Sequence, residues 1–184
     1  MRALDSAPDA EVIESVLAGD ADAFSVLLER YRDSYTRFAV RMLSDREDAD
    51  DALQSAFIRA FRNLEKCRDR DRFGSWLYQI VVNECRTLGS RRSRRDRKMV
   101  RDLNGLVQHT AGEAGGDGVA LEEIQRALNR LEPPYREAFI LRHVEDLSYQ
   151  EIAEITGDGI SALKMRVMRA CHQLRELLEG VHSD

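Results

Sequence analysis

The stretch LSYQEIAEITGDGISALKMRVMRACHQLRELL, residues 147–178, decides the fold of the C-terminal half of the chain. Ser148 and Glu151 have the spacing of a capping box, in which each side chain satisfies a backbone amide that the start of a helix leaves unpaired. Gly157 is expected to end this short helix, because glycine readily adopts the left-handed conformation that follows a helix. Apolar residues then recur at helical spacing over 160–178. The stretch therefore predicts a helix-turn-helix.

The longer of these two helices has one apolar face, which is predicted to be core. Its residues are Ile160, Leu163, Val167, Ala170, Leu174 and Leu177. The opposite face and its flanks carry Ser161, Ala162, Lys164, Met165, Arg166 and Arg169. Arginine can contact a guanine edge with two hydrogen bonds and lysine can hold a phosphate, so this face is predicted to read DNA. A solvated helix in an ordinary bundle is the alternative, but the cap, the glycine turn and the apolar spacing together favour DNA binding.

The first half of the chain is also predicted to be helical, because its apolar residues recur every three or four positions. One helix is predicted over 24–42. The next is predicted to begin at a second capping box, formed by Ser44 and Glu47, and to end near Asn63. The polar segment 65–72 alternates in charge and is predicted to be a loop.

A third helix of this half has Phe73 on its apolar side and grades into the basic run RRSRRDRK at 91–98. Residues 102–118 hold five glycines and show no sustained periodicity, which predicts a linker between two modules. The second module is predicted to begin near Leu121.

The composition limits the class of protein. The chain has 184 residues, of which 43% are hydrophobic and 33% charged, with only three prolines and eleven glycines, and these values are typical of a soluble all-α protein. Neither a membrane span nor a signal peptide is found, so a cytoplasmic location is predicted. The three cysteines show no CxxC spacing, and no set of nucleophile and base stands out. We therefore expect no metal, no cofactor and no catalytic residues.

The charges are unevenly distributed along the chain. The net charge is −5, yet the run 91–98 is strongly basic and lies between two acidic halves. Neutralisation of phosphates supplies most of the non-specific affinity for DNA, so an acidic protein should bind a free duplex poorly. If the chain reads DNA, a larger partner is predicted to supply most of the affinity.

Three segments resemble one known family. LEPPYREAFILRHVEDLSYQEIAEITG, at 131–157, is similar to region four, the promoter-reading module of extracytoplasmic-function sigma factors of the sigma-70 family. DADDALQSAFIRAFRNL at 48–64 and RFGSWLYQIVVNECRTL at 72–88 resemble regions 2.1 to 2.4 of the same family, in the same order.

The resemblance implies an all-α fold of two small helical modules joined by a flexible linker. Sigma region 2, which binds core polymerase and the minus-ten element, would occupy residues 1–90, and the basic and then glycine-rich linker 91–119. Sigma region 4, whose helix-turn-helix binds the minus-thirty-five element upstream, would occupy residues 120–180. It also implies a sigma factor that binds core RNA polymerase, through the β′ clamp helices and the β flap, and directs promoter recognition and DNA opening. An anti-sigma factor is an expected partner by the same resemblance.

The resemblance assigns roles to individual residues. The polymerase-binding residues would be Asp48, Asp50, Asp51 and Gln54, although carboxylates in the first turn of a helix are also favoured by the helix dipole alone. The minus-ten element would be contacted by Arg68, Asp69, Arg70, Arg72, Phe73, Trp76, Tyr78, Asn83 and Arg86. Trp76 has the spacing of a core residue, whereas Tyr78 lies off that apolar stripe and is predicted to be accessible to a base.

Two other functions remain open from the residues alone. The first is a stand-alone helix-turn-helix regulator that binds an operator, which would call for a receiver domain or ligand pocket upstream. The second is a protein-interaction module that does not read DNA, and the cations of the recognition face argue against it.

Overall fold

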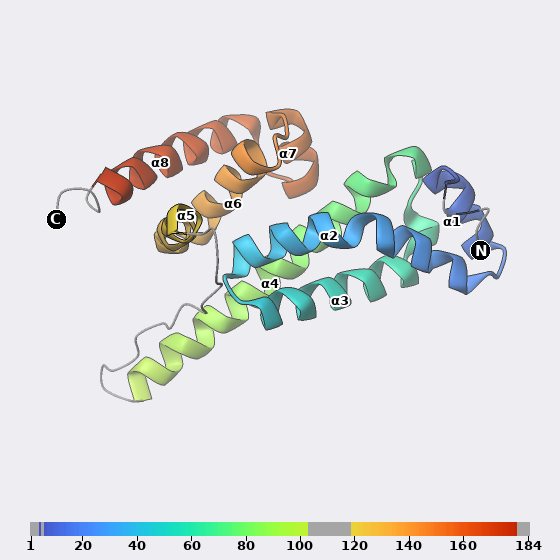
Figure 1. Cartoon of the computed structure of the whole chain (residues 1–184), viewed down its shortest axis with the longest axis horizontal. Helices are drawn as coiled ribbons and strands as arrows, with labels where there is room; N and C mark the ends of the chain where they lie inside the picture. The colour runs from blue at the N-terminus through green and yellow to red at the C-terminus, as the bar shows by residue number, and fades with distance from the viewer. Residues whose placement is uncertain (1–3, 5, 103–118, 180–184) are drawn as a thin grey trace.

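A computed structural model of the chain describes residues 4, 6–102 and 119–179, and every regular element among them is helical (Figure 1). The prediction of an all-α fold with two helical modules is therefore confirmed. The elements of the first module are α1 (Asp9–Leu17), η1 (Ala21–Ala23), α2 (Phe24–Leu43), α3 (Arg46–Arg62), η2 (Leu64–Lys66), η3 (Arg70–Arg72) and α4 (Phe73–Asp102). Those of the second are α5 (Val119–Arg130), α6 (Pro133–Phe139), the π-helical η4 (Ile140–Val144), α7 (Tyr149–Thr156) and α8 (Ile160–Glu179).

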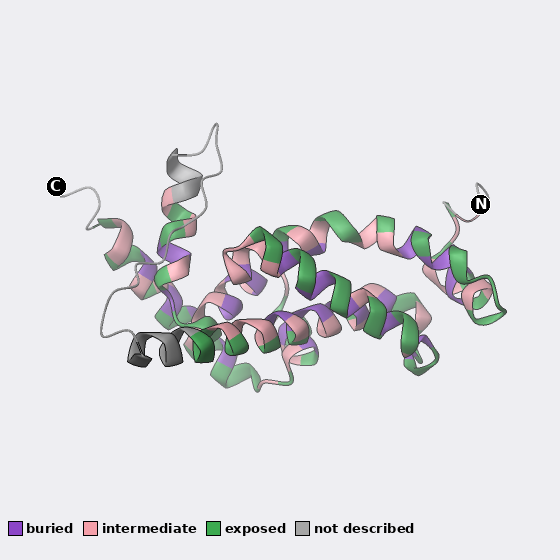
Figure 2. Ribbon diagram, turned by 90° about the horizontal axis from the view of Figure 1, so that it is seen from below, coloured by how far each residue is buried: buried purple, intermediate pink, exposed green. Residues whose placement is uncertain are grey.

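The first module is built on the three long helices α2, α3 and α4, which pack side by side (Figure 1). Their apolar stripes point inward, so buried residues line the inner faces and exposed residues the outer ones (Figure 2). Phe38, Leu77 and Val81 are fully buried in this core. Helix α1 covers one end of α2, where Arg30 of α2 forms an ion pair of 2.6 Å with Asp9.

The second module divides its apolar residues between two cores. Leu128, Leu131 and Leu174 form a small core of its own between α5 and α8. A second group joins the main core of the first module. Its fully or nearly fully buried members are Ile140, Leu141, Ile152, Ile155 and Leu163. The two modules are consequently docked on each other, with α7 against α4 (Figure 1).

The capping box predicted at the start of α7 is confirmed. The Ser148 hydroxyl accepts a hydrogen bond from the backbone N–H of Glu151 at 3.2 Å, and the Glu151 carboxylate accepts one from the N–H of Ser148 at 2.8 Å. Gly157 ends the helix with a φ of 74°, a left-handed conformation that costs glycine little. These local signals fix the angle at which α8 leaves the turn.

The predicted capping box of Ser44 and Glu47 is wrong by one residue. Ser44 is instead the C-cap of α2, with a φ of 60°, and Asp45 is the N-cap of α3. The Asp45 carboxylate accepts hydrogen bonds from the backbone N–H groups of Glu47, at 2.9 Å, and Asp48, at 3.1 Å. Only Ser44 and Asp45 separate α2 from α3. Ser44 adopts the left-handed conformation that ends α2 and redirects the chain. Asp45 is extended, the usual conformation of an N-cap residue, so it caps α3.

The basic run is helical. Helix α4 continues to Asp102, whereas the sequence predicted that the linker begins at 91. No glycine or proline follows Gly89 in this stretch, and arginine is a good helix former. Arg92 also forms ion pairs with Asp48 and Asp45 at the start of α3, which hold this part of α4 against the bundle. The segment 103–118 of the predicted linker lies outside the described residues.

The cap of α3 gives a test of the local structure. Replacement of Asp45 by Ala should lower the free energy of unfolding by about 1 kcal/mol, because two backbone N–H groups lose their acceptor. Glu47→Ala is the control, and it should have little effect because the Glu47 side chain is exposed and is not the capping group. Urea unfolding of the three proteins measures both differences. An equal loss in both variants would contradict the assignment of the cap.

The same cap should depend on pH. The pKa of Asp45 is held below its usual range, mainly by the hydrogen bond from the Asp48 N–H. The charge of Arg92 and the hydrogen bond from the Glu47 N–H act in the same direction. A carboxyl group whose pKa is lower in the folded state stabilises the fold above its unfolded pKa, about 3.9. The difference between wild type and Asp45→Ala should therefore shrink as the pH falls below that value.

Candidate functional site

Helix α8 presents the predicted DNA-reading residues on its open side. Leu163, Val167 and Ala170 are buried, as the apolar spacing predicted. The exposed positions are Ser161, Ala162, Lys164, Met165 and Arg169. Ile160 was predicted to be core, but 39% of its surface is exposed, because it is the first residue of the helix and lies one turn before the first buried position.

A groove of about 380 Å³ runs along this open side of α8. Its lining comes from the start of α6 and from the recognition face, namely Glu132, Pro134, Tyr135, Ala162, Met165, Arg166 and Arg169. Arg169 donates a hydrogen bond to the Tyr135 hydroxyl at 3.2 Å, so its guanidinium is positioned at the rim of the groove. Cationic and small apolar side chains thus share one accessible surface.

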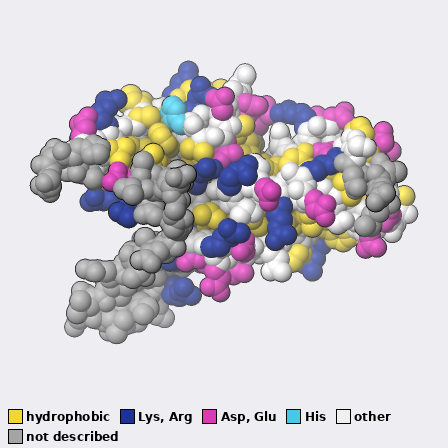
Figure 3. Space-filling view, in the orientation of Figure 1, with side chains coloured by type: hydrophobic (Ala, Val, Ile, Leu, Met, Phe, Trp, Pro, Cys, Tyr) yellow, Lys and Arg dark blue, Asp and Glu magenta, His cyan; other side chains and the backbone are white. Residues whose placement is uncertain are grey.

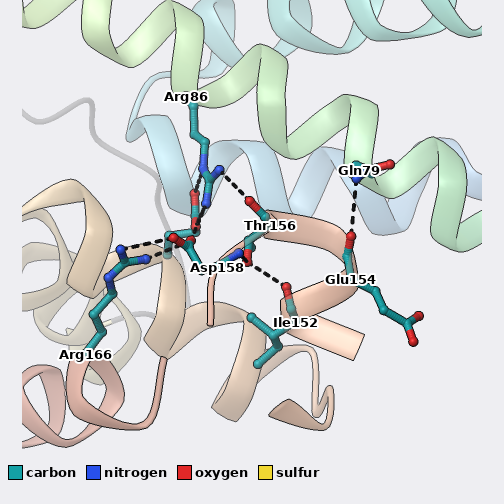
Figure 4. Close-up of polar contacts among 8 residues, drawn as sticks. Gln79, Arg86, Ile152, Glu154, Thr156, Asp158 and Arg166 are labelled. Carbon is teal, nitrogen blue, oxygen red and sulfur yellow. Dashed lines mark hydrogen bonds and ion pairs between the residues drawn. The ribbon is translucent and has the colours of Figure 1, made fainter. Parts of the chain in front are cut away.

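Arg166 is held differently from its neighbours on α8. Its guanidinium donates two hydrogen bonds to the Asp158 carboxylate, at 2.8 and 3.1 Å, in the turn between α7 and α8 (Figure 4). The hydrogen bond from Arg166 and the charges of Arg166 and Arg86 keep the pKa of Asp158 below its usual range. Arg166 is accordingly only half exposed and is already paired.

Arg86 of α4 completes a charged cluster with the same turn. It donates two hydrogen bonds to the Glu137 carboxylate of α6, at 2.7 and 2.6 Å, and a third to Asp158 at 3.1 Å. A fourth goes to the Thr156 carbonyl oxygen at 3.2 Å (Figure 4). Glu137 is 3% exposed and is the one buried charged residue among the side chains that the structure describes. The hydrogen bonds that Arg86 donates to Glu137 raise the pKa of Arg86, so its guanidinium stays charged.

The loop before α4 holds the other predicted minus-ten cations. Arg68 and Asp69 are exposed. Arg70 forms an ion pair of 2.8 Å with Glu14 of α1, and Arg72 forms one of 2.6 Å with Glu154 of α7. Gln79, one residue beyond Tyr78, donates to the Glu154 carbonyl oxygen at 3.2 Å (Figure 4). Helix α7 is therefore attached both to α4 and to the loop before it.

The predicted minus-ten aromatics lie mainly in the core. Phe73 is fully buried, and Trp76 is half-buried with its ring centroid 5.8 Å from that of Phe73. Tyr78 is only 7% exposed and stacks on Tyr35 with ring centroids 5.0 Å apart, so the prediction that it is accessible is wrong. The reason is that α4 is covered by α2 and α3 on one side and by α7 on another, so residues off the first apolar stripe are also buried.

The predicted polymerase-binding residues lie along the first half of α3. Asp50, Asp51 and Gln54 are exposed, whereas Asp48 is half-buried and ion-paired with Arg92. Two apolar side chains extend the same face, because they follow Gln54 by four and seven positions. They are Ile58, 46% exposed, and Phe61, 43% exposed. These two residues were not among the predicted contacts, although their helical spacing places them on the same face.

Comparisons with known proteins agree with this geometry. The family description "Sigma-70 region 2" matches residues 27–96, and "Sigma-70, region 4" matches residues 121–174. The "ECF RNA polymerase sigma factor SigW" of Bacillus subtilis is 31% identical, over 92% of this chain and 96% of its own. The chain belongs to the extracytoplasmic-function sigma factors of the sigma-70 family. As a sigma factor, it directs transcription from specific promoters, which decides against the stand-alone regulator.

Two solved structures have a similar fold. The sigma factor RpoE of Bartonella quintana, in complex with the anti-sigma factor NepR, has a TM-score of 0.70 and 27% identity, covering 85% of this chain and 96% of its own. CnrH, in complex with the cytosolic domain of CnrY, has a TM-score of 0.68 and 25% identity, covering 95% of this chain and 99% of its own. Among the described residues of this sigma factor, no helix has the length and hydropathy needed to cross a membrane.

The residues that join the two modules of this sigma factor were not predicted from the sequence. Glu137, Glu154 and Asp158 were not singled out, yet each is paired with a predicted DNA-contacting arginine. A carboxylate at a position of α6 that faces inward was the available signal, since a charge is buried only with a partner. The identity of that partner depends on the tertiary arrangement.

The buried tyrosines of the sigma factor give a test of the core. Tyr78→Phe should raise the free energy of unfolding by about 1 kcal/mol, because the buried Tyr78 hydroxyl has no hydrogen-bond partner. Tyr35→Phe is the matched control and should lower it by about as much, because the Tyr35 hydroxyl donates to the Gly74 carbonyl oxygen at 2.8 Å. Urea unfolding measures both. A loss of stability in Tyr78→Phe would show that its hydroxyl does have a partner.

Proposed function

We propose that this sigma factor binds core RNA polymerase through the outer face of α3 and reads the two promoter elements with α4 and α8. The observation that carries the proposal is the geometry of α8. A helix that is packed by one apolar face, and oriented by a capped helix and a glycine turn, presents small and cationic side chains on its opposite face. That is the arrangement by which a recognition helix enters the major groove.

The polymerase-binding surface combines charge with apolar area. Asp50, Asp51 and Gln54 supply exposed polar groups, and Ile58 and Phe61 supply apolar surface directly beyond them. Interfaces draw most of their affinity from a few well-packed residues surrounded by polar contacts. We propose that this stripe docks on the β′ clamp helices, with Asp48 joining it when released from Arg92, and that region 4 contacts the β flap.

The minus-ten surface consists of the loop before α4 and the helix itself. Arg68, Asp69 and Asn83 are exposed, and Arg70 and Arg72 lie in the same loop region. Cations near an opened duplex bind the freed strand, and Trp76, the least buried of the three predicted minus-ten aromatics, is available for stacking on a base. Phe73 and Tyr78 support this surface from the core rather than contact the bases.

The proposal also includes a regulatory partner and a cellular location. Because RpoE of Bartonella quintana, which has a similar fold, was solved in complex with the anti-sigma factor NepR, we propose that an anti-sigma factor also holds this sigma factor inactive. The proposed site of action is the cytoplasm, where core polymerase works, and the protein has no proposed catalytic activity of its own. Acidic and basic side chains are interspersed over the face seen in Figure 3, which supports weak binding to free duplex DNA.

Co-purification with core RNA polymerase, followed by run-off transcription from genomic fragments, tests the function directly. The full chain should form a complex with core polymerase and give transcripts from a limited set of promoters that core polymerase alone does not use. Failure to bind core polymerase would contradict the proposal.

The apolar part of the α3 surface has its own test. Ile58→Ala should weaken binding to core polymerase by about fivefold or more, the effect of truncating an interface anchor. Ile124→Ala is the matched control, because Ile124 is equally exposed, 45% against 46%, but lies on α5 of the other module. Competition with the wild-type protein for labelled core polymerase measures the affinity of each variant. Equal affinities of the two variants would remove Ile58 from the surface.

The recognition helix is tested by Arg169→Ala. Loss of a base-contacting arginine typically weakens discrimination by about 1–3 kcal/mol, so run-off transcription from promoters that carry the preferred upstream element should fall about tenfold. Arg175→Ala, on the same helix but outside the recognition face, should change little. Unchanged promoter choice in Arg169→Ala would exclude Arg169 as a contact.

A further inference from the structure

Tyr135 of α6 and Arg169 of α8 form a side-chain pair at the edge of the recognition face. The Tyr135 hydroxyl accepts a hydrogen bond from Nη1 of Arg169 at 3.2 Å. Both residues line the groove that also contains Ala162 and Met165. Arg169 follows these two by seven and four positions, so the three lie along one stripe of α8. The hydrogen bond therefore holds the residue of this stripe whose side chain can donate to a base.

The ring of Tyr135 is a rigid support for this hydrogen bond. Tyr135 is half-buried and packs against the small core between α5 and α8. It directly follows Pro133 and Pro134, whose fixed φ angles stiffen the start of α6. A tyrosine side chain has only two rotatable bonds before its ring. Packing of the ring thus fixes the position of the hydroxyl.

Arg169 needs such a support because its side chain is long and exposed. An arginine loses much rotamer freedom when it is held by a ligand, and this loss opposes binding. The hydrogen bond to Tyr135 restricts the guanidinium before DNA is bound. Restriction of a side chain in its bound conformation lowers the entropic cost of the contact. The pair is therefore suited to preorganise a contact, provided that it leaves donors for a base.

A comparison with Arg166 shows that the Tyr135 hydrogen bond does leave donors. Both terminal nitrogens of Arg166 donate to the Asp158 carboxylate, so a fixed anion takes up that guanidinium. Tyr135 offers a hydroxyl group in place of a carboxylate and accepts from one nitrogen of Arg169. A guanidinium has five N–H donors in one plane, so those on Nε and Nη2 remain for a bidentate contact with a guanine edge.

We propose that Tyr135 is a positioning residue for promoter recognition, which holds Arg169 in the conformation that reads a base pair of the upstream element. The inference rests on the proposed function, in which Arg169 contacts DNA. Tyr135 acts through Arg169 and is not itself a base contact. Loss of its hydroxyl should therefore reduce discrimination at the base pair that Arg169 reads and leave the other base pairs unaffected.

Tyr135→Phe of the full chain is the test variant, because it removes the hydroxyl and retains the packed ring. Tyr31→Phe is the matched control. Tyr31 is also half-buried and its hydroxyl is also hydrogen-bonded, to Asp9, but it lies on α2 of the first module. Thermal unfolding followed by circular dichroism verifies that both variants are folded.

The first measurement is the mobility of Arg169 in the free full chain. The Nε resonance of Arg169 in ¹⁵N-labelled protein, identified by its absence from the spectrum of Arg169→Lys, gives an order parameter. The order parameter should fall in Tyr135→Phe and keep the wild-type value in Tyr31→Phe. An unchanged value in Tyr135→Phe would overturn the inference, whatever the protein does at a promoter.

The second measurement is promoter discrimination by the holoenzyme. A promoter found in the run-off assay is prepared with each base pair of its upstream element replaced in turn. Arg169→Ala should remove most of the preference at the base pair that Arg169 reads. Tyr135→Phe should reduce the preference at that same base pair about threefold, the effect of one lost hydrogen bond. Tyr31→Phe should match wild type at every base pair.

The double variant that combines Tyr135→Phe with Arg169→Ala separates positioning from other roles. It should match Arg169→Ala, because Tyr135 then has no side chain to position, and the two effects are not additive. A further loss in the double variant would show that Tyr135 contacts DNA directly or supports the fold, and it would overturn the inference.

The single variants distinguish failure of the inference from failure of the proposed function. A change of base preference in Arg169→Ala without one in Tyr135→Phe overturns the inference alone. If Arg169→Ala changes no base preference, the proposed contact of Arg169 fails and the inference fails with it. A uniform loss at all base pairs in Tyr135→Phe would also overturn the inference, since a positioning residue affects only the base pair that its arginine reads.

Discussion

The pairing of Glu137 with Arg86 is the interaction on which the arrangement of the two modules depends. Glu137 lies in α6 with 3% of its surface exposed, and burial of an unpaired carboxylate is prohibitively unfavourable. The compensating cation comes from α4, in the other module. Arg136, the preceding residue, donates a hydrogen bond to the Met42 carbonyl oxygen at 2.8 Å at the end of α2. Adjacent residues of α6 thus attach the second module to two helices of the first.

In the proposed function Arg86 contacts DNA, and this pairing then connects the stability of the docked arrangement with the binding of DNA. The Arg86 guanidinium can satisfy Glu137 or a phosphate, but not both with its full set of donors. The two promoter-reading surfaces are affected unequally. Helix α7 covers α4, whereas α8 keeps Ser161, Ala162 and Arg169 exposed, and Arg166 is ion-paired with Asp158. The proposed recognition face of α8 is therefore largely exposed in the docked arrangement, whereas α7 covers part of the proposed minus-ten face of α4.

Local signals were read correctly from the sequence where neighbouring residues alone decide the outcome. The Ser148 and Glu151 box and the Gly157 turn depend on groups within a few positions of each other. The prediction of a capping box at Ser44 was wrong because Ser44 ends α2 in the left-handed conformation, so Asp45 caps α3. The prediction that Tyr78 is accessible was wrong for a different reason. Helical spacing identifies one buried face, but α4 is packed on more than one side, and a second buried face leaves no separate periodic signal.

The long helices, their apolar faces and the order of the modules could be predicted from the sequence, because capping, spacing and helix propensity act over a few residues. The same is true of the cations proposed to bind DNA. Which of these cations are ion-paired within the chain follows from the tertiary arrangement. Arg86 and Glu137 are 51 positions apart, and Arg72 and Glu154 are 82 apart, so their pairing follows from the way α6 and α7 dock on α4. The physical reason is that an ion pair depends on distance in space, which the spacing of residues along the chain does not record.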